Sequence, residues 1–592
     1  MRMVNLLKQT ENSKTFKWGL MATILLTTLF AGYLCNKGLP LAEGWYDYYA
    51  SQILDGEVVY KDFEFLFTPI YIYFMTFFIK IVGNDILCMR ILGVVMFVII
   101  AILLFCIMSR IFTVSASFFG ATTAVFYLQS EVYSVFYDYV RLMDIAALLS
   151  ILFMTSAVIK WSKQNKATVD LILWGIFTSV FILIKQNMGL LFAVFSVIFL
   201  VATLMYLKQT LGHIIKLLTI YVITVLIPII VTFLVISITS DLNLFLNSVF
   251  LGAAEAKGGI STVLFRWIIT GKDSFLLYFM SAAVAVLILI INYRISLSVR
   301  LDNVKSSIII TILGFFIFLI SLLVVMYNSQ IGSYFSMRKS VDAYFIFLIA
   351  FLLMLILIVV FLIDLIKKKT TYIKYLPLLG ILGAFFSISY GAGTSGGLSV
   401  GESALGVAAI ICLFMDSLKN HWGVGLRAII ISFCIFISMR NIGAKLILPC
   451  QWWGINSGSI YECTEQTTID GLSGIYMTPT EKNLYENVVE TIKQYSKEDE
   501  SIYCFPCIPI FYCLTDRKDP GVFSKVQWFD VSTNESVIAD INILKSNPPK
   551  VIVILNLDEA TYDGHESAFN SGEQWYTYNE RFSIQFCLYK SI

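Results

Sequence analysis

Long apolar runs separated by short polar stretches are the dominant pattern along this chain. Each run approaches the roughly 20 residues that an α-helix needs to cross a bilayer, so we expect an α-helical polytopic membrane protein. Thirteen spans are predicted, at residues 17–35, 85–108, 114–130, 142–159, 169–184, 188–207, 217–240, 274–293, 307–327, 341–365, 375–390, 402–416 and 424–440.

Two segments depart from this pattern. Residues 69–82 are apolar but extend only about 21 Å as a helix, too short for a span. We expect a short helix in the membrane interface, begun by Pro69 and followed by Gly83. Lys185 interrupts the block 169–207, which basic stretches flank on both sides. Because basic loops face the cytoplasm, an even number of spans must separate them, and we expect two helices joined at 185–187.

Charge divides the chain into two parts. Residues 441–592 hold 11 Lys/Arg against 20 Asp/Glu, a net of −9, which leaves +11 on the rest. The whole chain is 58% hydrophobic with a mean hydropathy of +0.80. The sequence therefore predicts a transmembrane domain at 1–440 and an aqueous domain at 441–592. The positive-inside rule puts the N-terminus in the cytoplasm, and the loop 36–84 and the acidic tail on the extracytoplasmic side of the cell membrane. No cleaved signal peptide is expected.

The tail alternates predicted helices and strands. Thr478, Pro479 and Glu481 form a capping-box start to an amphipathic helix, and another helix is expected near 536–546. Residues 501–505, 550–555 and 585–590 are predicted strands, which indicates a small α/β domain. Cys504 and Cys507 have redox spacing, but buried thiols or a structural bridge are commoner in such a place.

The first outer loop carries six acidic residues interleaved with Trp and Tyr. Trp45, Tyr46 and Tyr49 recur on one helical face, with Asp47 and other polar residues on the opposite face. This predicts a three-turn amphipathic helix whose aromatics lie at headgroup level. Two interpretations remain open: a reaction chamber at the bilayer edge with Glu43 at the helix start, or an interfacial anchor with solvated acids.

Several motifs in this region carry a family resemblance. The segments "ILDGEVVYKDF", "TPIYIYF" and "MRILG", within residues 40–95, resemble the first outer loop of the GT-C membrane glycosyltransferases. Protein O-mannosyltransferases, lipid A aminoarabinose transferases and related bacterial enzymes belong to that group. "FYDYVR" and "LIKQNMG" match more loosely.

The resemblance implies a fold and an activity. It implies about thirteen spans, two juxtamembrane helices in the first outer loop and an extracytoplasmic C-terminal domain. The activity implied is an inverting hexosyl- or pentosyltransferase that uses a polyprenyl-phosphate-linked sugar and a glycan, lipid or protein acceptor in cell-surface glycan assembly. No cofactor, metal or nucleic acid is expected, since neither an Asp-x-Asp motif nor a His cluster is present.

In the family that this chain resembles, a loop carboxylate takes the proton of the acceptor hydroxyl. The resemblance makes Glu43 the base. Ala42 stands where relatives often have the catalytic Asp, so Asp62 and then Asp47 remain alternatives.

A second acid is expected from the next outer loop. Asp138, with Tyr139 and Arg141, lies on the correct side of the membrane to face Glu43. The alternative is a helix cap with a local ion pair. Tyr46 and Trp452 are further expected substrate contacts, although anchoring in the interface is the commoner use of such a Trp.

Cations are expected to hold the departing lipid phosphate. The candidates are Arg90, Lys185, Lys257 and Arg266. Lys185 sits in an apolar block where a charge is expensive, which favours a function, although a Lys near a helix end often extends to the interface instead.

Two other classes of function are compatible with this organisation. A lipid-linked glycan polymerase or ligase would share the architecture. A lipid or glycan transporter is disfavoured because the charged residues gather at the outer rim instead of at mid-span.

Overall fold

The computed structural model describes most of the chain. It covers residues 13–131 except 42, 136–251, 339–393 except 368, 400–417, 441–526 except 444, 453 and 454, and 534–556, with single residues at 279, 283, 287, 434 and 438.

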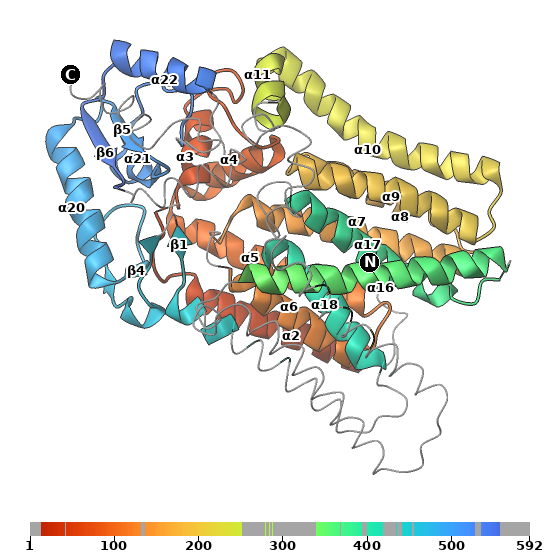
Figure 1. Cartoon of the computed structure of the whole chain (residues 1–592). Coiled ribbons are helices and arrows are strands. Elements are labelled where there is room, and N and C mark those ends of the chain that lie inside the picture. The colour runs from red at the N-terminus through yellow and green to blue at the C-terminus, as the bar shows by residue number, and fades with distance from the viewer. Residues whose placement is uncertain are drawn as a thin grey trace.

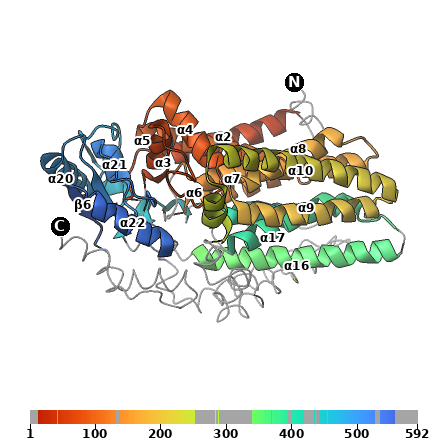
Figure 2. The same cartoon turned by 90° about the horizontal axis from the view of Figure 1, so that it is seen from above.

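Long helices running side by side make up most of the described structure (Figures 1 and 2). Ten of the thirteen predicted spans coincide with them: α2 (Ser13–Leu34), α5 (Ile86–Met108), α6 (Val114–Gln129), α7 (Tyr139–Ser162), α8 (Thr168–Ile182), α9 (Gln186–Tyr206), α10 (Leu211–Thr239), α16 (Lys339–Ile366), α17 (Leu376–Gly393) and α18 (Val400–Ser417).

Seven of the described helices are long and apolar enough to cross a membrane, which is the signature of an integral membrane protein. The predicted spans at 274–293, 307–327 and 424–440 lie almost wholly outside the described residues. The count of thirteen therefore stays a prediction, as do the sidedness and the boundary near residue 440.

The interruption at Lys185 separates two helices, as predicted. α8 ends at Ile182, and α9 begins at Gln186 with Lys185 as its N-cap residue. Beyond α10 come a short helix, α11 (Leu242–Leu246), and a π-helical turn, η2 (Asn247–Leu251). A 3₁₀ turn, η3 (Ile373–Tyr375), precedes α17.

Two short helices form the first outer loop, with nearly the predicted bounds. α3 spans Trp45–Leu54 and α4 spans Ile70–Val82, the latter capped by Pro69 and Gly83. The surroundings of α3 differ from the prediction, however. Its aromatic side chains are buried between the bundle and the C-terminal elements, and Asp47 on its polar face is completely buried. The expected placement of α3 with one face among lipid headgroups and the other in water is therefore wrong.

The C-terminal elements, teal to blue in Figures 1 and 2, pack against the end of the bundle beside α3. Two short antiparallel pairs come first, β1 (Gln451–Trp452) with β2 (Ile455–Asn456) and β3 (Glu465–Gln466) with β4 (Tyr476–Met477); the 3₁₀ turn η4 (Ile460–Glu462) lies between them. α20 (Pro479–Tyr495) follows, with the predicted Thr478–Glu481 capping box.

A parallel strand pair lies at the centre of the tail. β5 (Ile502–Phe505) pairs with β6 (Val551–Ile554), and α21 (Ile510–Thr515) and α22 (Asn534–Ser546) lie between them in sequence. Such a crossover is typical of α/β structure. These elements match the predicted helices and two of the three predicted strands, while 585–590 lies outside the described residues.

Candidate functional site

Glu43, the expected base, is held in a buried ion pair. Arg90, on the second turn of α5, donates from Nε to Glu43 Oε1 at 2.7 Å and from Nη2 to Oε2. Arg90 also donates to the carbonyl oxygens of Cys35, Lys37 and Gly38. Both oxygens of Glu43 thus accept from one guanidinium, and the residue is 1% exposed. This bidentate geometry is the strongest form of such a pair, and it ties α3 and the end of α2 to α5.

Asp47 lies one turn further along α3 in an apolar environment. Tyr137 donates its hydroxyl to Asp47 Oδ2 at 2.6 Å, and Asp47 Oδ1 has no hydrogen-bond partner among the described residues. Burial is the main cause that raises the pKa of Asp47 from 3.8 to about 7. Near neutral pH the carboxyl is therefore partly protonated.

Asp138 is half-buried at the start of α7. Its Oδ1 accepts from the backbone N–H of Val140 at 3.2 Å and is 3.5 Å from the Tyr46 hydroxyl. Burial raises the pKa of Asp138 to about 6, partly opposed by the positive charges of Arg141 and Lys185. The predicted alternative of a helix cap is thus confirmed, while Arg141 forms its ion pairs with Glu131 and Asp144.

Lys185 lies beside Asp138 among aromatic rings. Its Nζ is 4.2 Å from the centroid of the Phe67 ring and 5.0 Å from that of Tyr139, within the range of cation–π attraction. The Tyr46 ring meets the Tyr139 ring edge-on at 6.3 Å. We call Tyr46, Phe67, Asp138, Tyr139 and Lys185 the Asp138 site.

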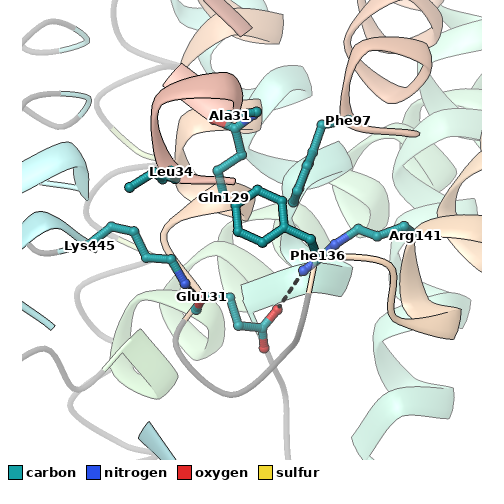
Figure 3. Close-up of a pocket in the computed structure, with 8 residues that line it drawn as sticks. All are labelled: Ala31, Leu34, Phe97, Gln129, Glu131, Phe136, Arg141 and Lys445. Carbon is teal, nitrogen blue, oxygen red and sulfur yellow. Dashed lines mark hydrogen bonds and ion pairs between the residues drawn. The ribbon is translucent and has the colours of Figure 1, made fainter. Parts of the chain in front are cut away.

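Arg141 faces a small neighbouring cavity (Figure 3). Arg141 and Lys445 approach Glu131 from opposite sides (Figure 3). Arg141 Nη2 is 3.6 Å from Glu131 Oε2, and Lys445 donates to the Glu131 carbonyl oxygen at 2.6 Å. Gln129 adds a further polar group to the wall, and the Phe136 ring belongs to its apolar lining.

Of the other predicted site residues, Asp62 is not brought to this region. Asp62 is exposed, and its Oδ2 accepts from the Val58 N–H at 2.8 Å within a local turn. Trp452 lies in β1, while Lys257 and Arg266 fall outside the described residues. The structure therefore gathers Glu43, Asp47, Asp138, Arg90, Arg141 and Lys185 at one end of the bundle and leaves Asp62 apart.

The other acids of the first loop bind the C-terminal elements. Tyr48 donates its hydroxyl to Asp519 Oδ2 at 2.5 Å, and Lys525 bridges Asp519 at 3.1 Å and Glu57 at 3.0 Å. Glu64 accepts from the Ser536 hydroxyl at 2.9 Å. These contacts explain why the loop carries so many acids: several of them fasten the loop to the tail.

Sequence reasoning missed four residues of this region: Gln129, Glu131, Tyr137 and Lys445. Lys445 was identifiable, because it is an isolated charge in the apolar stretch "NIGAKLILPC", the same signal that identified Lys185. Gln129, Glu131 and Tyr137 carry no such signal. In the part of the chain that the structure describes, no three His, Cys, Asp or Glu side chains converge as a metal-binding group.

No protein-family model and no curated protein matches the chain. Among solved structures, it is similar to the archaeal oligosaccharyltransferase AglB from Archaeoglobus fulgidus, solved in complex with an inhibitory peptide and a dolichol-phosphate. The TM-score is 0.45 and the identity 12%, over 94% of this chain and 72% of that one. A likeness at this level decides neither the family nor the activity.

Proposed function

We propose that this chain is a membrane glycosyltransferase that moves a sugar from polyprenyl phosphate to an acceptor hydroxyl on the extracytoplasmic side of the cell membrane. The observation that carries the proposal is the Asp138 site, in which a carboxylate and an ammonium flank Tyr139 at the end of the bundle. The motif resemblance of residues 40–95 supports the same class of enzyme.

Asp138 is the proposed base. A general base must accept a proton near neutral pH and reach its substrate. With a pKa of about 6, the Asp138 carboxyl is mostly ionised at pH 7 yet more basic than an ordinary Asp, and it is half-buried and not sealed. Glu43 has both oxygens engaged by Arg90, so it has no oxygen aimed at an acceptor.

Lys185 is the proposed partner of the leaving phosphate. It stands at the N-terminus of α9, where the helix dipole and unpaired N–H groups favour an anion. As the acceptor oxygen bonds to the anomeric carbon, the bond from that carbon to the phosphate oxygen breaks. Asp138 takes the hydroxyl proton, and the lipid phosphate departs with the electron pair beside Lys185. A single displacement of this kind inverts the anomeric configuration.

The position of the charges favours surface chemistry over transport. Every Asp, Glu, Lys, Arg or His in the described spans lies within six residues of a helix end. Transporters bind substrates and coupling ions near mid-span, on broken helices with inward-facing charges. The charges here instead lie near the two ends of the helices, and the Asp138 site is at the end beside the C-terminal elements.

The test is sugar transfer by purified protein in nanodiscs, with a labelled sugar on polyprenyl phosphate. Wild type is expected to release the label from the lipid, and Asp138→Asn to be slower by about 10²–10⁴-fold with unchanged melting temperature. Asp62→Asn, which alters an exposed acid in a neighbouring loop, is the matched control and should retain the wild-type rate. Wild-type protein that consumes no polyprenyl-linked donor would overturn the proposal, as would an active Asp138→Asn variant.

A further inference from the structure

The cavity between Gln129 and Lys445 contains polar groups that the proposed reaction does not use. Gln129, the last residue of α6, is 4% exposed, and neither its amide oxygen nor its amide nitrogen has a hydrogen-bond partner in the described structure. A buried amide with both ends unsatisfied is costly and rare. A ligand that bonds to it would remove this cost.

Lys445 is a second unusual group in the same wall. It is 5% exposed, and its ammonium donates to one backbone carbonyl, that of Glu131. No carboxylate of the described residues lies within ion-pair distance of it. Buried lysines are normally paired with an acid, so this ammonium lacks the usual counter-charge.

A second small cavity adjoins the first. The two share Leu34, Phe136 and Lys445, and the second also contains Lys37, Arg90 and Glu43. Arg141 and Glu131 line the first. Together the walls carry four cations and two carboxylates, so the pair of cavities has a net charge of +2.

We propose that these two cavities bind an oxyanion, a phosphate or carboxylate group, of the sugar acceptor. Lys445 supplies the counter-charge, and the Gln129 Nε2–H donates to the anion while its Oε1 accepts from a neighbouring hydroxyl. Lys445, Pro449, Cys450 and Ile460 of the C-terminal region form part of the wall. That the oxyanion belongs to the sugar acceptor rests on the proposed function; the binding of an oxyanion in these cavities does not.

The experiment is calorimetric titration of the full-length protein in nanodiscs with glucose 6-phosphate, glucuronate and neutral glucose. Wild type is expected to bind at least one of the two anions more tightly than glucose. Lys445→Met and Gln129→Leu should each weaken anion binding by about tenfold or more, the value of one charge-assisted hydrogen bond. Lys550→Met, which alters an exposed lysine, should leave anion binding unchanged.

Melting temperature separates binding from structure. Gln129→Leu should melt at the wild-type temperature or above it without ligand, because it removes an unsatisfied buried amide. A clearly lower melting temperature would mean that Gln129 has a structural role and would overturn its part in the site.

Three binding results would overturn the proposal. The first is that wild type binds both anions and glucose with equal affinity. The second is that Lys445→Met and Gln129→Leu both bind the anions as tightly as wild type does. The third is that a short-chain polyprenyl phosphate binds in a way that depends on Lys445 but not on Lys185. The last result would assign the cavity to the lipid donor. If the wild-type protein transfers no sugar, the proposed function is refuted, but the results on anion binding are unaffected.

Discussion

Glu43 and Asp138 are both acids at the same end of the bundle, but their surroundings differ. Glu43 has a guanidinium on both oxygens and is sealed from solvent. Asp138 is half-buried, caps α7 and lies next to Lys185 across the Tyr139 ring. The first arrangement suits a fixed structural link, and the second places a carboxylate and an ammonium close together in a half-buried site. The comparison shows that an acid's partners, and not its place in a motif, indicate its role.

The largest expected effect on stability is at the Glu43 link. Glu43→Gln should lower the free energy of unfolding by about 3–5 kcal/mol, because it leaves the buried Arg90 charge uncompensated. Chemical unfolding in detergent measures this. Asp55→Asn, which removes an exposed acid paired with Lys518, is the control and should cost at most about 1 kcal/mol. Equal effects of the two variants would contradict the structural role of Glu43.

The cation of the Asp138 site gives the next largest effect. Lys185→Met should slow sugar transfer by about 10²–10³-fold, the usual loss on removing one group that stabilises a developing anion. Steady-state transfer rates measure it, with Lys61→Met, on the exposed surface of the first loop, as control. A Lys185→Met enzyme with the wild-type rate would assign the departing phosphate to another cation.

A smaller effect is expected where the first loop meets the tail. Tyr48→Phe removes the hydroxyl that donates to Asp519 and should cost about 1.5–3 kcal/mol, the range for a hydrogen bond to a charged group. Tyr33→Phe, on the exposed side of α2, should cost nothing measurable. If both variants unfold at the wild-type denaturant concentration, the buried Tyr48–Asp519 contact does not fasten α3 to the tail.

Taken per pH unit, the smallest effect concerns the pH dependence of stability. Burial raises the pKa of Asp47 and of Glu64 to about 7 in the folded protein. An acid whose pKa is higher in the folded state than in the unfolded state binds more protons when the protein is folded. The free energy of unfolding therefore falls as the pH rises from the unfolded-state pKa to the folded-state pKa of about 7. Each group should lower stability by at most about 1.4 kcal/mol per pH unit in that window.

Melting curves between about pH 5 and pH 8 test this dependence. The double variant Asp47→Asn/Glu64→Gln should flatten the slope relative to wild type. An unchanged slope in the double variant would show that neither carboxyl titrates in this range.

Local signals predicted the elements well. The capping box at Thr478 and Glu481, the turn at Lys185 and the bounds of α3 and α4 all depend on residues within a few positions of one another. Such signals are present in any short window of the sequence, which is why those elements were predictable.

The partners of the acids were not predictable in the same way. Glu43 and Arg90 lie 47 residues apart, and Tyr48 and Asp519 lie 471 apart. Helical periodicity placed Asp47 on a polar face, but contact with Tyr137 and with the tail buries that face. Only tertiary packing determines which carboxylates have both oxygens held by hydrogen bonds or ion pairs and which do not.

The most direct test of the account compares Glu43→Gln and Asp138→Asn in one measurement, the single-turnover rate of labelled sugar transfer per folded molecule. The account predicts that folded Glu43→Gln retains most of the wild-type rate, while Asp138→Asn loses about 10²–10⁴-fold at an unchanged melting temperature. The reverse result, in which folded Glu43→Gln is inactive and Asp138→Asn transfers sugar normally, would make Glu43 the base and contradict the account.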